Sequence, residues 1–291
     1  MPLLIGIIIL FFILWSAIGS SQVVRQPRYQ PPITPEEFHL PWESLNLLTA
    51  DKIHISGWLI RHLAPQGILL FLHGYGTSKA DLLDLAQAVY SQGPYHLILI
   101  DFRGHGYSGG SVISFGREEI KDVQAVLDFV AADQSLTRLP VGCLGISMGG
   151  SIAILAAAQF QRIQAVVSDS AYSELGQAIA RGIWMSYHIP WFPLGQFVIW
   201  WTELRLKCAM KELSPVYAIG KIAPRPILII HGAQDKTTLV SNARDLFESA
   251  AMPKEIWCAP DSEHVGVFFK QREEYLNRVF RFFENGLRRA S

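Results

Sequence analysis

Short apolar runs alternate with longer segments of helical periodicity from Glu43 to the end of the chain. The runs are bounded by Gly, Pro and polar residues, as buried strands usually are. The pattern predicts eight strands, at 44–48, 54–61, 68–72, 96–100, 141–145, 165–168, 226–230 and 255–258. Between them it predicts helices at 79–91, 117–132, 148–159, 239–251 and 271–288. This alternation predicts an α/β fold with a mostly parallel, doubly wound, eight-stranded sheet whose first two strands form an antiparallel hairpin.

The N-terminus is apolar without interruption. Residues 3–19 have the sequence LLIGIIILFFILWSAIG, and no charged side chain occurs before Arg25. As a helix with a rise of about 1.5 Å per residue, residues 1–24 would cross a hydrocarbon core of about 30 Å. We therefore predict an uncleaved, single-pass transmembrane anchor at 1–24. Because Arg25 and Arg28 follow this segment, the positive-inside rule places the domain after it in the cytoplasm.

Two alternatives remain for the same segment. Ala17-Ile18-Gly19 before Ser20 resembles a cleavage site, which would make the segment a signal peptide and the protein secreted. A buried core helix is the other alternative, although the segment is apolar on every face. Residues 25–40 include four prolines between Gln26 and Pro35, which indicates an extended linker. Residues 41–291 then form the globular domain.

Charge and cysteine content narrow the classes of function. The 291 residues include 25 Lys plus Arg and 25 Asp plus Glu. A neutral chain offers little clustered positive charge for phosphates, so no nucleic-acid partner is expected. Cys143, Cys208 and Cys258 are scattered and have no metal-ligand or redox spacing, so we expect free thiols in a reducing compartment.

The sequence Gly145-Ile146-Ser147-Met148-Gly149 is a G-x-S-x-G motif between a predicted strand and a predicted helix. A nucleophile elbow has this context, because a sharp strand-to-helix turn exposes the serine hydroxyl and flanking glycines prevent clashes. We therefore predict Ser147 as a catalytic nucleophile.

A serine hydroxyl needs a base and an orienting carboxylate, which follow the nucleophile in the order acid, then histidine. His264 lies in a polar loop between the last predicted strand and the last helix, so it is the predicted base. His231 closes a predicted strand, and packing is the expected role there. Asp235 follows that strand and is the predicted acid; its alternative role is a turn or helix cap. Asp169 is the second candidate acid.

Acyl transfer also needs two backbone N–H donors for the developing oxyanion. Met148, directly after the nucleophile, is expected to supply one donor. Tyr75, in His73-Gly74-Tyr75-Gly76 at the end of a buried strand, is expected to supply the other. Such a site requires no organic cofactor and no metal.

These motifs, together with DFRGHGYSGG at 101–110, resemble the α/β-hydrolase superfamily over about residues 40–288. Within it the chain is similar to serine-aminopeptidase-like and monoglyceride-lipase-like hydrolases, including membrane-anchored members. The resemblance implies an α/β-hydrolase fold, a bracing role for the 101–110 loop, and a helical cap at 171–216 over Ser147. Aromatic residues of this cap are candidate substrate-binding residues: Trp184, Trp191, Phe192 and Trp200.

The expected function is hydrolysis of carboxylic esters, with a small-molecule or lipid ester as substrate. The same triad cleaves thioesters and amides, so an acyl-protein thioesterase and a serine aminopeptidase are alternatives. A non-catalytic scaffold is a further one. The cap rings are expected either to pack internally, to face the cleft or to enter a membrane interface, where tryptophan is enriched.

Overall fold

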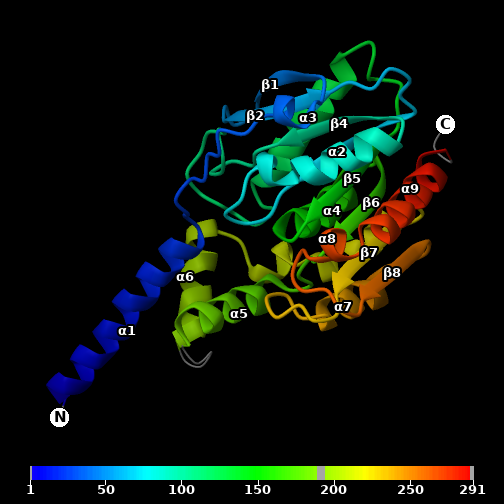
Figure 1. Ribbon diagram of the computed structural model, residues 1–291. Coiled ribbons are helices and arrows are strands. Elements are labelled where there is room, and N and C mark those ends of the chain that lie inside the picture. The colour runs from blue at the N-terminus through cyan, green and yellow to red at the C-terminus, as the bar shows by residue number, and fades with distance from the viewer. Residues whose placement is uncertain (1, 189–193, 289–291) are drawn as a thin grey trace.

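An eight-stranded sheet forms the centre of the computed structural model, with strand order β1-β2-β4-β3-β5-β6-β7-β8 (Figure 1). β1 and β2 form the predicted hairpin, β2 is also antiparallel to β4, and the other neighbours are parallel. All eight predicted strands are confirmed: β1 (Trp42–Leu48), β2 (His54–Ile60), β3 (Gly67–Leu72), β4 (Tyr95–Ile100), β5 (Val141–Ile146), β6 (Ile163–Asp169), β7 (Ile227–Gly232) and β8 (Lys254–Ala259). The structure describes residues 2–188 and 194–288, without the side chains of 2–5 and 7–9.

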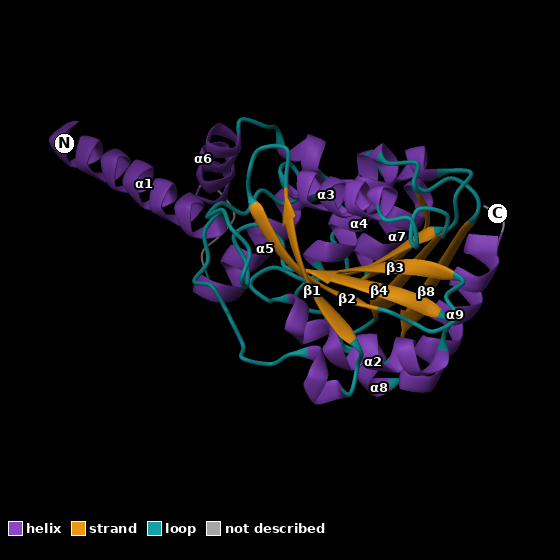
Figure 2. Cartoon of the chain, turned by 90° about the horizontal axis from the view of Figure 1, so that it is seen from above, coloured by secondary structure: helices purple, strands orange, loops and turns teal. Residues whose placement is uncertain are grey.

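Helices cover both faces of the sheet, as the doubly wound prediction requires (Figure 2). On one face lie α3 (Glu119–Ala132), α4 (Met148–Gln159) and α7 (Ser241–Ser249). On the other lie α2 (Leu83–Gln92), α8 (Val267–Lys270) and α9 (Arg272–Arg288). Alternate residues of β3 reach the two layers: Leu70 packs with the first set, whereas Leu69 and Phe71 pack with the second. Burial on both faces explains why the central strands are continuously apolar.

The insertion between β6 and β7 carries α5 (Leu175–Tyr187) and α6 (Gln196–Leu206). These helices lie beyond the carboxyl ends of the parallel strands, beside the N-terminal helix α1 (Pro2–Val23) (Figure 1). Thr202 of α6 donates a hydrogen bond to the Ser20 hydroxyl, and Arg205 donates one to the Ala17 carbonyl. α1 is therefore packed against the insertion along its C-terminal half.

The structure does not support two predictions for the N-terminal region. Over the part of the chain whose side chains are described, no helix combines the length and apolar character that crossing a bilayer requires, so the span predicted at 1–24 is not supported. The 25–40 segment also lies on the domain instead of extending away from it. Arg28 donates hydrogen bonds to the carbonyls of Ser108 and Gly110, and Gln30 donates one to the Gly106 carbonyl at 2.8 Å.

Candidate active site

Ser147 occupies the turn between β5 and α4. Its φ of 55° lies in the left-handed region, which side chains rarely adopt. A Cβ at Gly145 would overlap the Gly149 carbonyl, and a Cβ at Gly149 would overlap the Leu72 carbonyl. Only glycine fits both positions, so the spacing of the motif is required by backbone packing. The turn presents the Ser147 side chain to a cavity.

The three predicted polar side chains come together at the carboxyl ends of β5, β7 and β8. Ser147 Oγ lies 3.0 Å from His264 Nε2, and His264 Nδ1 lies 2.6 Å from Asp235 Oδ2. His264 lies in the loop after β8 and Asp235 in the loop after β7. With the hydrogen on Nδ1 donated to the carboxylate, Nε2 is free to accept the serine proton.

Asp235 is buried and fully engaged. Its Oδ1 accepts hydrogen bonds from the backbone N–H groups of Thr237 and Thr238, both at 2.8 Å. Burial alone would raise the pKa of Asp235, but hydrogen bonds from His231 and His264 outweigh it and lower the pKa to about 2. The carboxylate is therefore charged at neutral pH. Asp235 also organises the 235–238 turn, so the two roles weighed for it coexist.

His231 and Asp169 hold the segments that carry Asp235 and His264. His231 is buried, and its Nε2 lies 2.6 Å from the Thr238 carbonyl and 3.3 Å from Asp235 Oδ2. Asp169 accepts a hydrogen bond from the Ser170 hydroxyl at 2.8 Å, and Ser170 Oγ accepts one from the Val265 N–H at 3.1 Å. Asp169 thus reaches the histidine loop through Ser170.

The two predicted oxyanion donors flank the nucleophile. Met148 is the first residue of α4, and N–H groups in a first helical turn have no acceptor within the helix. A Cβ at Gly74 would lie 3.4 Å from Ser147 Cβ, so the 73–76 segment runs directly past the nucleophile. Tyr75 and Met148 both line the cavity that contains Ser147.

Two histidines that were not predicted as site residues hold the 73–76 segment. His73 Nε2 accepts the Phe102 N–H at 3.0 Å, and His105 Nε2 accepts the Gly76 N–H at 3.1 Å. Burial, foremost, lowers the pKa of both imidazoles, which keeps them neutral and able to accept. Both residues belong to motifs quoted above, but the spacing of those motifs does not predict these two hydrogen bonds.

A buried ion pair holds the loop at 101–110. Lys79 Nζ lies 2.5 Å from Asp101 Oδ2, and Asp101 also accepts the backbone N–H groups of Lys79 and Tyr107 at 2.8 and 2.9 Å. Gly106 has a φ of 44°, and a Cβ there would overlap the Asp101 carboxylate. The loop is therefore tied to the sheet beside the site.

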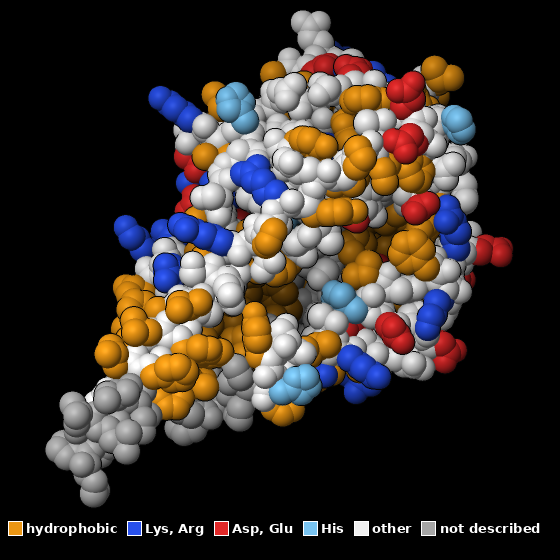
Figure 3. Space-filling model, turned by 60° about the vertical axis from the view of Figure 1, so that its left-hand side comes forward, with side chains coloured by type: hydrophobic (Ala, Val, Ile, Leu, Met, Phe, Trp, Pro, Cys, Tyr) orange, Lys and Arg blue, Asp and Glu red, His pale blue; other side chains and the backbone are white. Residues whose placement is uncertain are grey.

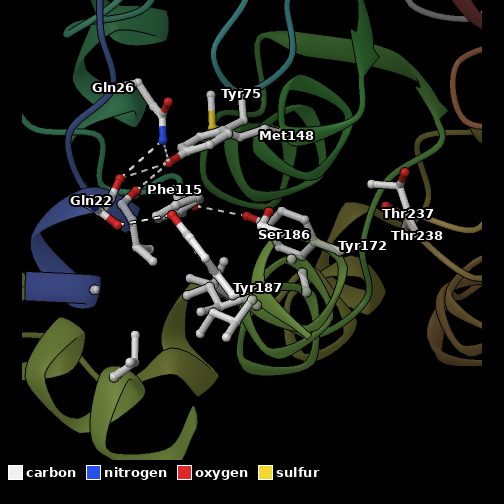
Figure 4. A pocket seen from close by; sticks show the side chains of 18 of the residues that line it. Gln22, Gln26, Tyr75, Phe115, Met148, Tyr172, Ser186, Tyr187, Thr237 and Thr238 are labelled. Carbon is white, nitrogen blue, oxygen red and sulfur yellow. Dashed lines mark hydrogen bonds between the residues drawn. The ribbon is translucent and has the colours of Figure 1, made fainter. Parts of the chain in front are cut away.

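A cavity of about 430 Å³ opens over Ser147, within the usual range for small-ligand sites. Its described lining is mostly apolar and contains no charged side chain (Figure 4). Of the four aromatic cap residues predicted to bind substrate, Trp184 and Trp200 do not line this cavity and are 48% and 54% exposed. Trp191 and Phe192 lie outside the described residues. Tyr75, Phe115, Tyr172 and Tyr187 are the tyrosine and phenylalanine rings that line the cavity.

Comparisons with known proteins agree with this architecture. The family model described as serine aminopeptidase, S33 matches residues 64–194. The esterase Pf2001 of Pyrococcus furiosus superposes with a TM-score of 0.77 at 25% identity, covering 91% of this chain and 98% of that one. The Bacillus subtilis protein YqkD is 28% identical over 229 residues, which cover 77% of this chain and 74% of YqkD.

One relative, from yeast, is described as a membrane protein. The chain is 22% identical over 236 residues to the membrane protein YNL320W of Saccharomyces cerevisiae, covering 79% of this chain and 76% of that one. The family model spans β3 to β6 and the elbow at Ser147, and the solved esterase structure covers most of the chain. The chain is therefore a hydrolase of the α/β-hydrolase superfamily, of the type that includes esterases and peptidases.

Proposed function

We propose that this protein is a serine esterase that hydrolyses uncharged carboxylic esters with an apolar chain. The observation that carries the proposal is the chain of contacts from Ser147 through His264 to a charged, buried Asp235, opening into an apolar cavity. An apolar cavity with a few polar groups favours an apolar substrate held by its reacting carbonyl.

In the proposed reaction, Ser147 Oγ attacks the ester carbonyl while His264 Nε2 takes its proton. The backbone N–H groups of Tyr75 and Met148 stabilise the resulting oxyanion. His264 then donates the proton to the departing alcohol, which leaves an acyl group on Ser147. Water, deprotonated by His264, attacks this acyl-enzyme and releases the acid and the free serine. Asp235 stays ionised throughout and stabilises the imidazolium.

The cavity lining favours an ester over a peptide N-terminus. A peptide substrate of an aminopeptidase carries a charged α-amino group, which needs a carboxylate or several acceptors when buried. No Asp or Glu occurs among the described residues that line the cavity. We therefore expect the p-nitrophenyl ester of an N-acetylated amino acid to be cleaved at least about tenfold more efficiently than the same ester with a free amino group, because a charged amino group buried without a partner is costly.

The test is hydrolysis of p-nitrophenyl butyrate by the wild type and by Ser147→Ala, with Ser151→Ala as the matched control. Ser151 lies in α4, the helix that follows Ser147, and is fully buried outside the cavity lining. Ser147→Ala should lose more than 99.9% of turnover, on the order of the 10⁶-fold loss known for triad serines, whereas Ser151→Ala should retain turnover. Undiminished turnover by Ser147→Ala would refute the proposal.

We also propose that α1 holds the enzyme at a membrane surface. Four large apolar side chains of α1 are exposed by 55–62%: Leu10, Phe11, Leu14 and Ile18. Figure 3 shows hydrophobic side chains gathered toward this end of the molecule. A relative described as a membrane protein supports the same placement. Exposed apolar surface of this kind is costly in water and favours an interface.

Vesicle flotation tests the membrane proposal. The full chain should float with phosphatidylcholine vesicles, and Leu10→Ser/Phe11→Ser/Leu14→Ser should remain at the bottom of the gradient. The control Leu48→Ser/Leu63→Ser/Met252→Ser changes three exposed apolar residues away from α1 and should still float. Equal flotation of the two triple variants would contradict the proposal that α1 holds the enzyme at a membrane surface.

A further inference from the structure

One face of the N-terminal helix forms part of the cavity over Ser147. The lining residues from this helix and the turn after it recur at helical spacing: Trp15, Ile18, Gly19, Gln22, Val23 and Gln26. Intervals of three and four residues place side chains on one face of a helix. Trp15 and Val23 are separated by about 12 Å along the axis, at a rise of about 1.5 Å per residue. The helix therefore offers the cavity a continuous strip of side chains.

The α5 helix supplies the facing strip. Leu175, Ala178, Ile179, Gly182 and Ile183 line the same cavity with the same spacing. Glycine keeps the space between the helices open. A Cβ at Gly182 would meet no atom within 4 Å, and one at Gly19 would meet only Val198 Cγ2 at 3.4 Å. Larger side chains at these two positions would therefore project into the cavity without a clash at Cβ.

Hydrogen bonds fix α1 to the domain near the nucleophile. The Tyr75 hydroxyl donates to the Val23 carbonyl at 2.8 Å, and Gln26 Nε2 donates to the Tyr75 hydroxyl at 2.6 Å (Figure 4). The Tyr187 hydroxyl of the cap donates to Gln22 Oε1 at 3.1 Å. Burial raises the pKa of Tyr75 to about 12, so its hydroxyl keeps its proton. These bonds hold the cavity-lining face of α1 in register with Ser147.

We propose that α1 is a wall of the substrate-binding site and that its Trp15–Val23 strip, facing α5, binds the apolar chain of the ester and limits its length. The proposal rests on the proposed esterase function. It gives α1 a role in substrate selection in addition to any role at a membrane. The chain could come from the acyl or from the alcohol side of the ester, and both present the same methylene surface.

The test compares specificity constants across two ester series, p-nitrophenyl acyl esters from C2 to C12 and alkyl acetates from C2 to C12. Gly19→Leu in α1 and Gly182→Leu in α5 fill the space between the two helices. The control is Gly6→Leu, which also lies in α1 but outside the cavity lining. Both filling variants should lower the C10-to-C2 ratio of kcat/KM at least tenfold in one series, since one methylene in an apolar site changes the rate about 10- to 200-fold. The series that responds identifies the source of the chain.

Unchanged ratios in both series for both filling variants would overturn the proposal, as would an equal change in Gly6→Leu. If Gly19→Leu does not fold, Trp15→Ala tests the role of α1 instead. It should raise the C10-to-C2 ratio of kcat/KM by opening the cavity, and an unchanged ratio overturns the proposal.

Binding of methyl decanoate to Ser147→Ala tests the role of α1 separately from the esterase function. Ser147→Ala/Gly19→Leu should bind it at least tenfold more weakly than Ser147→Ala does. Equal binding by the two proteins would contradict the proposal that α1 is a wall of the substrate-binding site. Weaker binding by the double variant, together with no ester turnover by the wild type, would contradict only the esterase function.

Discussion

The Tyr75 hydroxyl donates a 2.8 Å hydrogen bond to the backbone carbonyl of Val23, the last residue of α1. The backbone of Tyr75 lies beside the nucleophile, so one residue connects the proposed oxyanion site with the N-terminal helix. Tyr75→Phe removes this bond and keeps the ring. We expect it to lower the free energy of unfolding by about 1 kcal/mol, measured by urea titration. It should reduce kcat/KM for a C10 ester more than for a C2 ester; an equal reduction for both would contradict the connection.

Removing the charge of Asp235 tests its role toward His264. Asp235→Asn no longer stabilises the imidazolium and favours the wrong tautomer, so kcat should fall by about 10⁴-fold. Asp169→Asn is the matched control, because Asp169 is also a buried carboxylate and reaches the histidine loop through Ser170. Its kcat should fall by about tenfold or less. Steady-state kinetics on p-nitrophenyl butyrate measures both, and a larger loss in Asp169→Asn would reverse the assignment of the acid.

Ser170 should act as a positioning residue for His264. Its hydroxyl accepts the Val265 N–H, which fixes the residue after the base. Ser170→Ala removes the hydrogen bonds of this hydroxyl to Asp169 and Val265. Loss of the bond to Val265, about 1 kcal/mol, corresponds to an about fivefold to tenfold lower kcat with KM unchanged. Ser173→Ala, a buried serine bonded to Asn242, should leave kcat unaltered. A rise in KM without a change in kcat would exclude the positioning role.

The neutral state of His73 should make stability depend on pH. Burial lowers the pKa of His73 in the folded protein, whereas an unfolded histidine titrates near 6.5. Below about pH 6.5 the unfolded chain therefore binds a proton that the folded chain does not, and the free energy of unfolding falls as the pH falls. The slope for one such group is at most about 1.4 kcal/mol per pH unit.

A comparison with His73→Gln isolates this group, because the amide oxygen can still accept the Phe102 N–H. Urea titrations between pH 4.5 and 7.5 should show a steeper loss of stability for the wild type than for the variant. Parallel curves would show that His73 titrates normally in the folded protein.

The sheet and the three polar side chains could be predicted because their signals are local. Central strands buried on both faces are continuous apolar runs. Gly145 and Gly149, which backbone contacts require on either side of Ser147, form a short sequence motif. Asp235 and His264 follow the last two strands, and the carboxyl ends of parallel strands meet at one edge of the sheet.

The substrate cavity could not be predicted in the same way. An N-terminal helix that is apolar on every face gives no indication of which face packs, so Trp15 and Gly19 carried no sign of a cavity. In the cap, the sequence shows that Trp184 and Trp200 are aromatic but not where their rings point, because tertiary packing sets the orientation and leaves both about half exposed. His73 and His105 brace the 73–76 segment through contacts between loops distant in sequence.

The most direct test of the account is to trap the acyl-enzyme. The protein is mixed with p-nitrophenyl decanoate, quenched in acid within the first turnover, digested and analysed by mass spectrometry. We predict a decanoyl group on Ser147 in the wild type and none at this position in Ser147→Ala. A decanoyl group on another residue, or ester turnover by Ser147→Ala at the wild-type rate, would contradict the assignment of Ser147 as the nucleophile.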